Sequence, residues 1–317
     1  MSDTVDAGRH LKLAVPDLIS NSYFPAAAAV ELGFFAKEGL DVSLELIFPV
    51  SKCYERLRDG AIDFVGGSAH SVLSAFPGWN GAKLIAAQGQ GMYWFLVMRS
   101  DLGAKRGNLE IVKGRRIGAA PWVEMGLRQL LISAGFDLER DRIEIVPVPP
   151  APGLGPNFGL GAARALEEGR IDGFWANGMG AEIAVRSGVG TVVLDIRRGD
   201  GPAGCFNYTM ASIAATDRLI AQSPDIAAAA VRAIVHTQRA LKSDVSLATA
   251  VGRKLFPARE AELIADIVAR DLPYYDATIS PEFVAGMNAF ARARGILNGD
   301  PAYEDVVASE FSPLWKS

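Results

Sequence analysis

Short apolar runs alternate with segments of helical periodicity along the first two thirds of the chain. Strands are predicted where four to seven residues are buried throughout or alternate polar and apolar side chains. They are expected at 11–15, 41–47, 62–65, 83–87, 115–119, 142–148, 171–176 and 192–196. Helices are expected between them at 24–37, 54–58, 69–75, 122–134 and 160–168. Strands that alternate with helices are typical of parallel βαβ units whose sheet is covered by helices.

From about residue 216 the pattern is helical, with predicted helices at 226–242, 259–271 and 281–294 that we expect to cover one lobe.

A short internal repeat suggests that the α/β part has two equivalent halves. The segments 55–64 and 164–174 share the pattern Leu-x-x-Gly-x-Ile-Asp. In each, a helix stopped by glycine is followed at once by a strand, although any two αβ turns can agree by chance.

Length and composition narrow the function classes. A chain of 317 residues has room for about two domains, and its net charge of −4 gives no basic surface for nucleic acid. Its two cysteines and three histidines show no metal-ligand spacing, so neither a metal nor a cofactor is expected. Residues 1–10 are polar and carry no secretory signal. The sequence therefore predicts a cytoplasmic protein, or a periplasmic one whose signal has been removed.

Three phrases in the order in which they occur resemble one solute-binding family. They are Glu-Leu-Gly-Phe-Phe-Ala-Lys-Glu-Gly-Leu-Asp-Val at 31–42, Leu-Arg-Asp-Gly-Ala-Ile-Asp-Phe at 57–64, and Ile-Val-Lys-Gly-Arg-Arg-Ile-Gly at 111–118. The chain is similar, over roughly residues 11–240, to the periplasmic solute-binding proteins of ABC importers for nitrate, sulfonates, taurine and formylpyrimidine. The related thiamine-pyrimidine synthases share this pattern.

The resemblance implies an α/β fold of the type II periplasmic-binding-protein class, with two lobes that are each a mixed sheet flanked by helices. The first lobe would comprise residues 11–93 and 205–317, the second residues 101–204, and the hinge crossovers 94–100 and about 204–210. The ligand would lie in the cleft between the lobes. Independently, open α/β sheets bind ligands beyond the carboxyl ends of their strands, where helix N-termini offer free N–H groups.

The candidate ligand-binding residues follow from this placement, since they lie at predicted strand-to-helix turns or beside the crossovers. They are Asp17, Asn21, Ser22, Tyr23, Gly67, Ser68, His70, Gln90, Tyr93, Pro121, Trp122, Glu124, Trp175, Asn177 and Asn207. Trp122 favours a flat ligand, and Glu124 could accept a hydrogen bond from an N–H group or a cation. The alternative is that these side chains only cap helices or fill the core.

The function expected is that of a binding protein for a small aromatic or heteroaromatic ligand, with an ABC permease and ATPase as partners. One alternative is a cytoplasmic enzyme on the same fold, resembling a desulfinase, decarboxylase, hydrolase or pyrimidine synthase, with His70 as its base. Another is a cytoplasmic ligand sensor with the same cleft. The first candidate ligand loop, 20–24, holds no cysteine nucleophile of the kind that desulfinases use.

Overall fold

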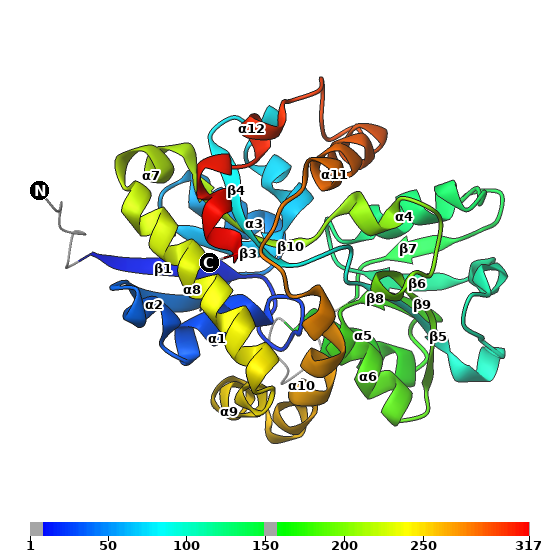
Figure 1. The fold of residues 1–317 in the computed structure, drawn as a ribbon. Coiled ribbons are helices and arrows are strands. Elements are labelled where there is room, and N and C mark those ends of the chain that lie inside the picture. Colours follow the sequence, from blue (N-terminus) through cyan, green and yellow to red (C-terminus); the bar gives the residue numbers. More distant parts are fainter. Residues whose placement is uncertain (1–8, 149–156, 317) are drawn as a thin grey trace, which may run out of the picture.

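Two five-stranded mixed sheets form the core of the protein (Figure 1). The computed structural model describes residues 9–148 and 157–316. The first sheet has the order β2-β1-β3-β10-β4. Its strands are β1 (His10–Val15), β2 (Asp41–Leu46), β3 (Phe64–Ser68), β4 (Ala82–Gly89) and β10 (Ala211–Thr216). In this sheet β1 runs parallel to β2 and β3, whereas β10 runs antiparallel to β3 and β4.

The second sheet repeats this plan in the order β7-β6-β8-β5-β9. Its strands are β5 (Phe95–Arg99), β6 (Arg116–Ala119), β7 (Glu144–Val146), β8 (Gly173–Ala176) and β9 (Gly190–Asp195). Here β5 is the antiparallel member, paired with β8 and β9. The predicted fold class, two mixed sheets flanked by helices, is confirmed.

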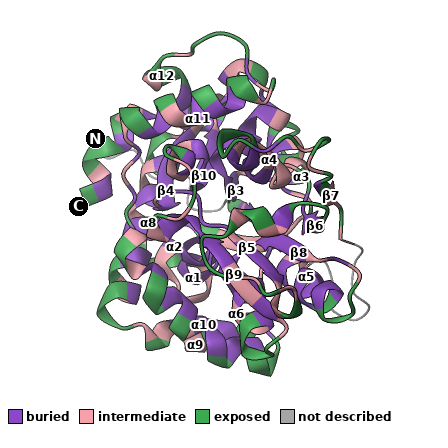
Figure 2. Ribbon diagram, turned by 90° about the vertical axis from the view of Figure 1, so that its right-hand side faces the viewer, coloured by how far each residue is buried: buried purple, intermediate pink, exposed green. Residues whose placement is uncertain are grey.

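Helices cover both sheets, and along many of them buried and exposed residues alternate, as the purple and green stretches of the ribbon in Figure 2 show. The α-helices are α1 (Phe24–Glu31), α2 (Phe34–Lys37), α3 (Val50–Arg58), α4 (Glu124–Ser133), α5 (Phe158–Glu167), α6 (Gly178–Arg186), α7 (Asp217–Gln222), α8 (Pro224–Ser243), α9 (Ser246–Leu255), α10 (Ala258–Asp271), α11 (Pro281–Ala293) and α12 (Tyr303–Val306). Short 3₁₀ turns are η1 (Ala69–Ser74), η2 (Pro77–Trp79), η3 (Ser100–Leu102), η4 (Leu109–Val112), η5 (Ile196–Arg198), η6 (Cys205–Tyr208), η7 (Leu272–Tyr274) and η8 (Ser309–Lys316). Within the described ranges, no helix is both long and apolar enough to cross a membrane.

Local chemistry explains where the elements differ from the predicted ones. The helix expected over 24–37 is interrupted at Gly33, whose φ of 73° is left-handed and therefore ends α1 before α2 begins. The helix expected at 69–75 is the 3₁₀ turn η1. The segments that form β5 and β10 are not among the strands predicted from the hydrophobic pattern, because a βαβ alternation indicates only parallel strands. The mixed sheets that these strands create are the ones that the family resemblance implies.

The chain passes between the sheets twice, after β4 and after β9. The first passage lies between Gly89 and Phe95, since β5 already pairs with strands of the second sheet. Most of the segment 94–100, which the sequence predicts to be a crossover, therefore belongs to strand β5. The second passage lies between Asp195 and Ala211.

The C-terminal helices do not all cover one lobe, which corrects the expectation from the sequence. Helix α10 lies against α6 of the second half, where Arg186 pairs with Asp266 at 3.0 Å and Arg270 pairs with Glu182. Helices α9 and α10 also share an apolar cluster with both halves. That cluster includes Phe24 of α1, Leu160 of α5, Met179 of α6, Val251 of α9 and Ile264 of α10. Packing on both halves makes α9 and α10 a strap across the molecule.

Candidate functional site

One pocket lies where the strand ends of the two halves face each other. Its cavity volume in this structure is about 40 Å³. It is lined by residues of both halves: Pro16, Asp17, Ser22, Tyr23, Phe48, Val50, Tyr93, Trp94, Ala120, Pro121, Val123, Phe158, Ala176 and Asn177. Six of the residues expected from the sequence therefore meet here, namely Asp17, Ser22, Tyr23, Tyr93, Pro121 and Asn177.

Asp17 and Asn177 join the two halves across this pocket. Asp17 follows β1, and Asn177 follows β8 at the N-cap of α6. The Asn177 Nδ2 group donates a hydrogen bond to Asp17 Oδ2 at 2.7 Å, while Asn177 Oδ1 accepts from the backbone N–H groups of Met179 and Gly180. One amide thus caps a helix and holds a carboxyl group of the opposite half.

The Asp17 carboxyl is buried, and burial raises its pKa to about 7. The Asn177 hydrogen bond and the backbone N–H groups of Ile19 and Gly159 oppose this shift. Within the described part of the chain, Asp17 Oδ1 has no hydrogen-bond partner, and neither has Ser22 Oγ. Both atoms are buried and belong to residues that line the pocket.

Two phenols complete the polar side of the pocket. The hydroxyl groups of Tyr23 and Tyr93 lie 2.9 Å apart, and their rings meet edge to face at 5.8 Å between centroids. Burial raises the pKa of both phenols, so they are neutral hydrogen-bonding groups at ordinary pH. The remaining lining is apolar and includes the rings of Phe48, Trp94 and Phe158.

His70, the candidate base, is buried beside the pocket and does not line it. Its Nδ1 lies 2.9 Å from Thr209 Oγ1 and its Nε2 lies 3.1 Å from the carbonyl oxygen of Trp122. Because a carbonyl oxygen only accepts, Nε2 carries the proton and Nδ1 accepts from the Thr209 hydroxyl. Burial lowers the pKa of His70 to about 4. Both ring nitrogens are therefore occupied by protein groups.

The other expected residues from the second half also lie outside the lining. Trp122 turns its carbonyl toward His70 through a left-handed φ of 71°, and its ring lies 6.2 Å from the imidazole. Glu124 is half-buried, and burial raises its pKa. Trp175 is fully buried and packs on Trp94 at 6.0 Å. Of these side chains, Trp175 supports the pocket wall through its contact with Trp94.

Five more expected residues are engaged within the protein. Ser68 Oγ pairs with Ser71 Oγ at 2.6 Å, and a Cβ at Gly67 would come within 2.8 Å of the Tyr54 hydroxyl. A Cβ at Gly286 would come within 2.6 Å of Asn207, so Asn207 packs against α11. The other two, Asn21 and Gln90, belong to a polar network at the passages between the sheets.

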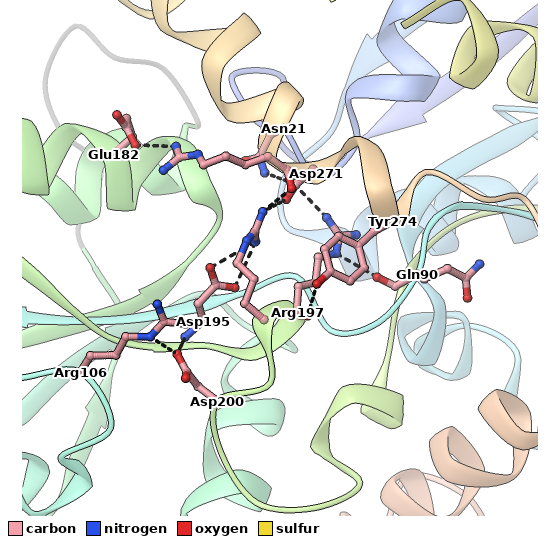
Figure 3. Close-up of polar contacts among 11 residues, drawn as sticks. Asn21, Gln90, Arg106, Glu182, Asp195, Arg197, Asp200, Asp271 and Tyr274 are labelled. Carbon is pink, nitrogen blue, oxygen red and sulfur yellow. Dashed lines mark hydrogen bonds and ion pairs between the residues drawn. The ribbon is translucent and has the colours of Figure 1, made fainter. Parts of the chain in front are cut away.

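That network centres on Arg197 and Asp271 (Figure 3). Asp271, at the end of α10, accepts from Arg197 at 2.9 Å, from Arg198 at 3.0 Å and from Asn21 at 2.6 Å. Arg197 also donates to the carbonyl of Gln90 at 2.8 Å. The network therefore ties together the ligand loop after β1, both passages between the sheets, and the strap.

Sequence reasoning missed Phe48, Trp94 and Phe158, which supply the aromatic wall. Phe48 follows β2, so the rule that ligands lie beyond strand carboxyl ends contained the signal for it. The glycine- and proline-rich sequence at 151–161 predicts a loop, of which residues 151–156 lie outside the described part of the chain. Phe158 opens α5 just after Asn157. In the described ranges, no group of three or more His, Cys, Asp or Glu side chains is placed to hold a metal ion.

Comparison with known proteins now gives the family. Residues 21–243 match the family described as "NMT1/THI5 like". The chain belongs to this family. No curated protein matches it in sequence.

Solved structures share the fold along nearly the whole chain. A protein from Bordetella bronchiseptica RB50 superposes with a TM-score of 0.75 at 20% identity, covering 97% of this chain and 96% of the other. A putative periplasmic sulfonate-binding protein, SsuA of Methylobacillus flagellatus KT, gives 0.70 at 18%, covering 98% and 95%. The periplasmic nitrate-binding protein NrtA of Synechocystis PCC 6803 gives 0.69 at 14%, covering 96% and 87%. This NMT1/THI5-like chain therefore has the fold of ABC-type periplasmic binding proteins.

Proposed function

We propose that this protein is the solute-binding component of an ABC importer and that it acts in the periplasm. The observation that carries the proposal is a pocket lined from both halves, with Asp17 of one half hydrogen-bonded to Asn177 of the other. A site shared in this way is formed when the halves close and exposed when they separate, as in hinge closure around a ligand. The passages at 90–94 and 196–210 serve as the hinge, and a permease with its ATPase receives the ligand.

The proposed ligand is a small aromatic or heteroaromatic molecule. The rings of Phe48, Tyr93, Trp94 and Phe158 supply apolar area for a flat molecule. Asp17 Oδ1 and Ser22 Oγ, with no partner in the described chain, are polar groups that can fix its orientation. The cytoplasmic-enzyme alternative has less support, because both nitrogens of His70 face protein groups.

The test is binding without turnover. Native mass spectrometry of the purified protein, followed by thermal-shift and calorimetric titration with aromatic amides, amidines, acids and pyrimidines, should find a saturable ligand. A ligand at about 1,000 times its Kd adds about 4 kcal/mol to the free energy of unfolding.

Trp94→Ala should weaken binding at least tenfold, whereas Ile132→Ala, an exposed position on α4, should leave the Kd unchanged. Recovery of a chemically altered ligand with repeated turnover would show an enzyme instead. A panel in which nothing binds would contradict the aromatic ligand class.

A further inference from the structure

Two helix N-termini of the second half meet at the pocket. Helix α5 begins at Phe158 and α6 at Gly178, and they run so close that a Cβ on Gly180 would lie 2.7 Å from the carbonyl oxygen of Gly159. A helix N-terminus presents N–H groups without intrahelical partners and a partial positive charge, which together favour an anion. The second half therefore offers an anion-binding position at the cleft.

A side chain of the first half occupies that position. Asp17 accepts from the N-cap residue of α6, Asn177, at 2.7 Å, and the Gly159 N–H in the first turn of α5 acts on the same carboxyl to lower its pKa. Asp17 is only 7% exposed, yet it lines the pocket. Its Oδ1 atom has no hydrogen-bond partner among the residues described. The chain thus supplies its own carboxyl group to the two N-termini and leaves one buried carboxyl oxygen without a hydrogen-bond partner among the residues described.

The rest of the lining does not offset this negative charge. Among the described residues around the pocket there is no lysine, arginine or histidine, and Asp17 is the charged member. An anionic ligand group would meet Asp17 where it would otherwise meet the helix N-termini. Like charges brought together in such a site oppose binding. A ligand that donates an N–H group would instead satisfy Asp17 Oδ1.

We propose that Asp17 determines the charge specificity of this cleft: it excludes anions and selects neutral or cationic ligands that donate an N–H group to its free oxygen. The inference rests on the proposed binding function and deepens it. It also separates this chain from the sulfonate- and nitrate-binding structures with which it shares its fold. In this chain a carboxyl group already fills the anion position.

The first experiment titrates methanesulfonate, a small anion without an aromatic group, into wild type, Asp17→Asn and Asp17→Ala at pH 8.5. Both variants should bind it at least tenfold more tightly than wild type. Asp41→Asn is the charge-matched control, because the Asp41 side chain is 77% exposed on the edge strand β2, and it should behave as wild type. Methanesulfonate binding that is equal in wild type and the Asp17 variants would overturn the proposal.

A second arm uses the wild-type protein alone and does not depend on how the variants fold. Burial raises the pKa of Asp17 to about 7, so the carboxyl is protonated at pH 5.5 and ionised at pH 8.5. The titratable groups beside it are the phenols of Tyr23 and Tyr93, whose pKa values burial raises. His70, behind the wall, has its pKa lowered to about 4. Arg197, whose guanidinium carbon lies 5.6 Å from the Tyr93 ring centroid, is a further nearby charge.

Across this range the wild type should bind methanesulfonate at least tenfold more tightly at the lower pH. The Asp17→Asn variant, tested in parallel, should show no such change. A pH dependence that is the same in both proteins would assign the effect to another group and overturn the proposal.

Three planar probes of nearly equal shape test the selected class. Benzamidine and benzamide should bind the wild type at least tenfold more tightly than benzoate, and Asp17→Asn should reduce this ratio. Benzoate that binds the wild type best would overturn the proposal. If none of the three binds, the aromatic ligand of the proposed function is wrong, while the methanesulfonate titrations still decide the role of Asp17.

Discussion

Removing the Asp271 carboxyl should destabilise the protein more than removing one partner of an exposed ion pair. The Arg197 and Asp271 side chains are 2% and 3% exposed, and their charged groups lie 2.9 Å apart. Asp271→Ala leaves the Arg197 guanidinium buried without its counter-charge. Breaking a buried pair in this way costs about 3–5 kcal/mol. The variant should also free the Nδ2 group of Asn21, which donates to Asp271 at 2.6 Å.

Urea unfolding followed by circular dichroism measures this loss as a shift of the midpoint. The matched control is Glu262→Ala, which breaks the pair of Arg253 and Glu262, whose side chains are 67% and 61% exposed. Exposed pairs contribute about 1 kcal/mol or less, so this control should unfold close to wild type. Equal losses in Asp271→Ala and Glu262→Ala would refute the argument from burial.

A double-mutant cycle separates the ion pair from the packing of its side chains. Arg197→Met combined with Asp271→Leu replaces both charges by apolar groups, so neither is left unpaired. The double variant should be more stable than the sum of the two single losses predicts, by at least about 1.5 kcal/mol. Strictly additive losses would show that the two groups do not stabilise each other.

Three further changes test the site. The pKa of His70 is lowered to about 4 in the folded protein, so the unfolded chain takes up the proton first as the pH falls. The free energy of unfolding should therefore fall by about 3 kcal/mol as pH drops from about 6.5 to about 4. In urea titrations His70→Gln should lack this loss, and an unchanged dependence of stability on pH would contradict the assignment of the loss to His70. Because the pKa of Asp17 is raised to about 7, its contribution to stability has the opposite sign, and stability should be lost as pH rises from about 4 to about 7. Asp17→Asn should remove that loss. Parallel pH profiles of the wild type and Asp17→Asn would contradict the assignment of this loss to Asp17. Gly180→Ala places a Cβ 2.7 Å from the Gly159 carbonyl oxygen, so it should lower the free energy of unfolding by about 1–3 kcal/mol and weaken probe binding. A variant as stable as wild type would show that α5 and α6 separate freely.

The sequence was sufficient to predict several residues that line the pocket, because the carboxyl ends of parallel strands follow from the βαβ alternation. Asp17, Pro121 and Asn177 lie just after β1, β6 and β8, and all three line the pocket. The same reasoning did not reveal that β5 and β10 return through the sheets as antiparallel strands. The apolar run of β5 stands at 95–99, but periodicity alone does not say with which sheet a strand pairs.

Side-chain direction was the other part that the sequence did not determine. His70 and Trp122 lie at turns next to the pocket, yet both are used between the halves, the imidazole of one donating to the backbone carbonyl of the other. That contact depends on a left-handed φ at Trp122. A tryptophan rarely adopts this conformation, so the sequence does not predict it. A turn can therefore be placed correctly while the residue that faces the ligand is its neighbour, here Pro121.

The hinge motion of the proposed function should affect two groups of contacts between the halves differently. The Asp271 network lies at the passages between the sheets, beside the proposed hinge, where atoms are displaced least on closure, and so it should persist in both states. The bonds from Asn177 to Asp17 and from His70 to Trp122 lie across the cleft and must break when the halves separate. A ligand that hydrogen-bonds to Asp17 either replaces the bond from Asn177 or adds a second one. The Asp17 carboxyl therefore takes part both in ligand binding and in the contacts that hold the halves together.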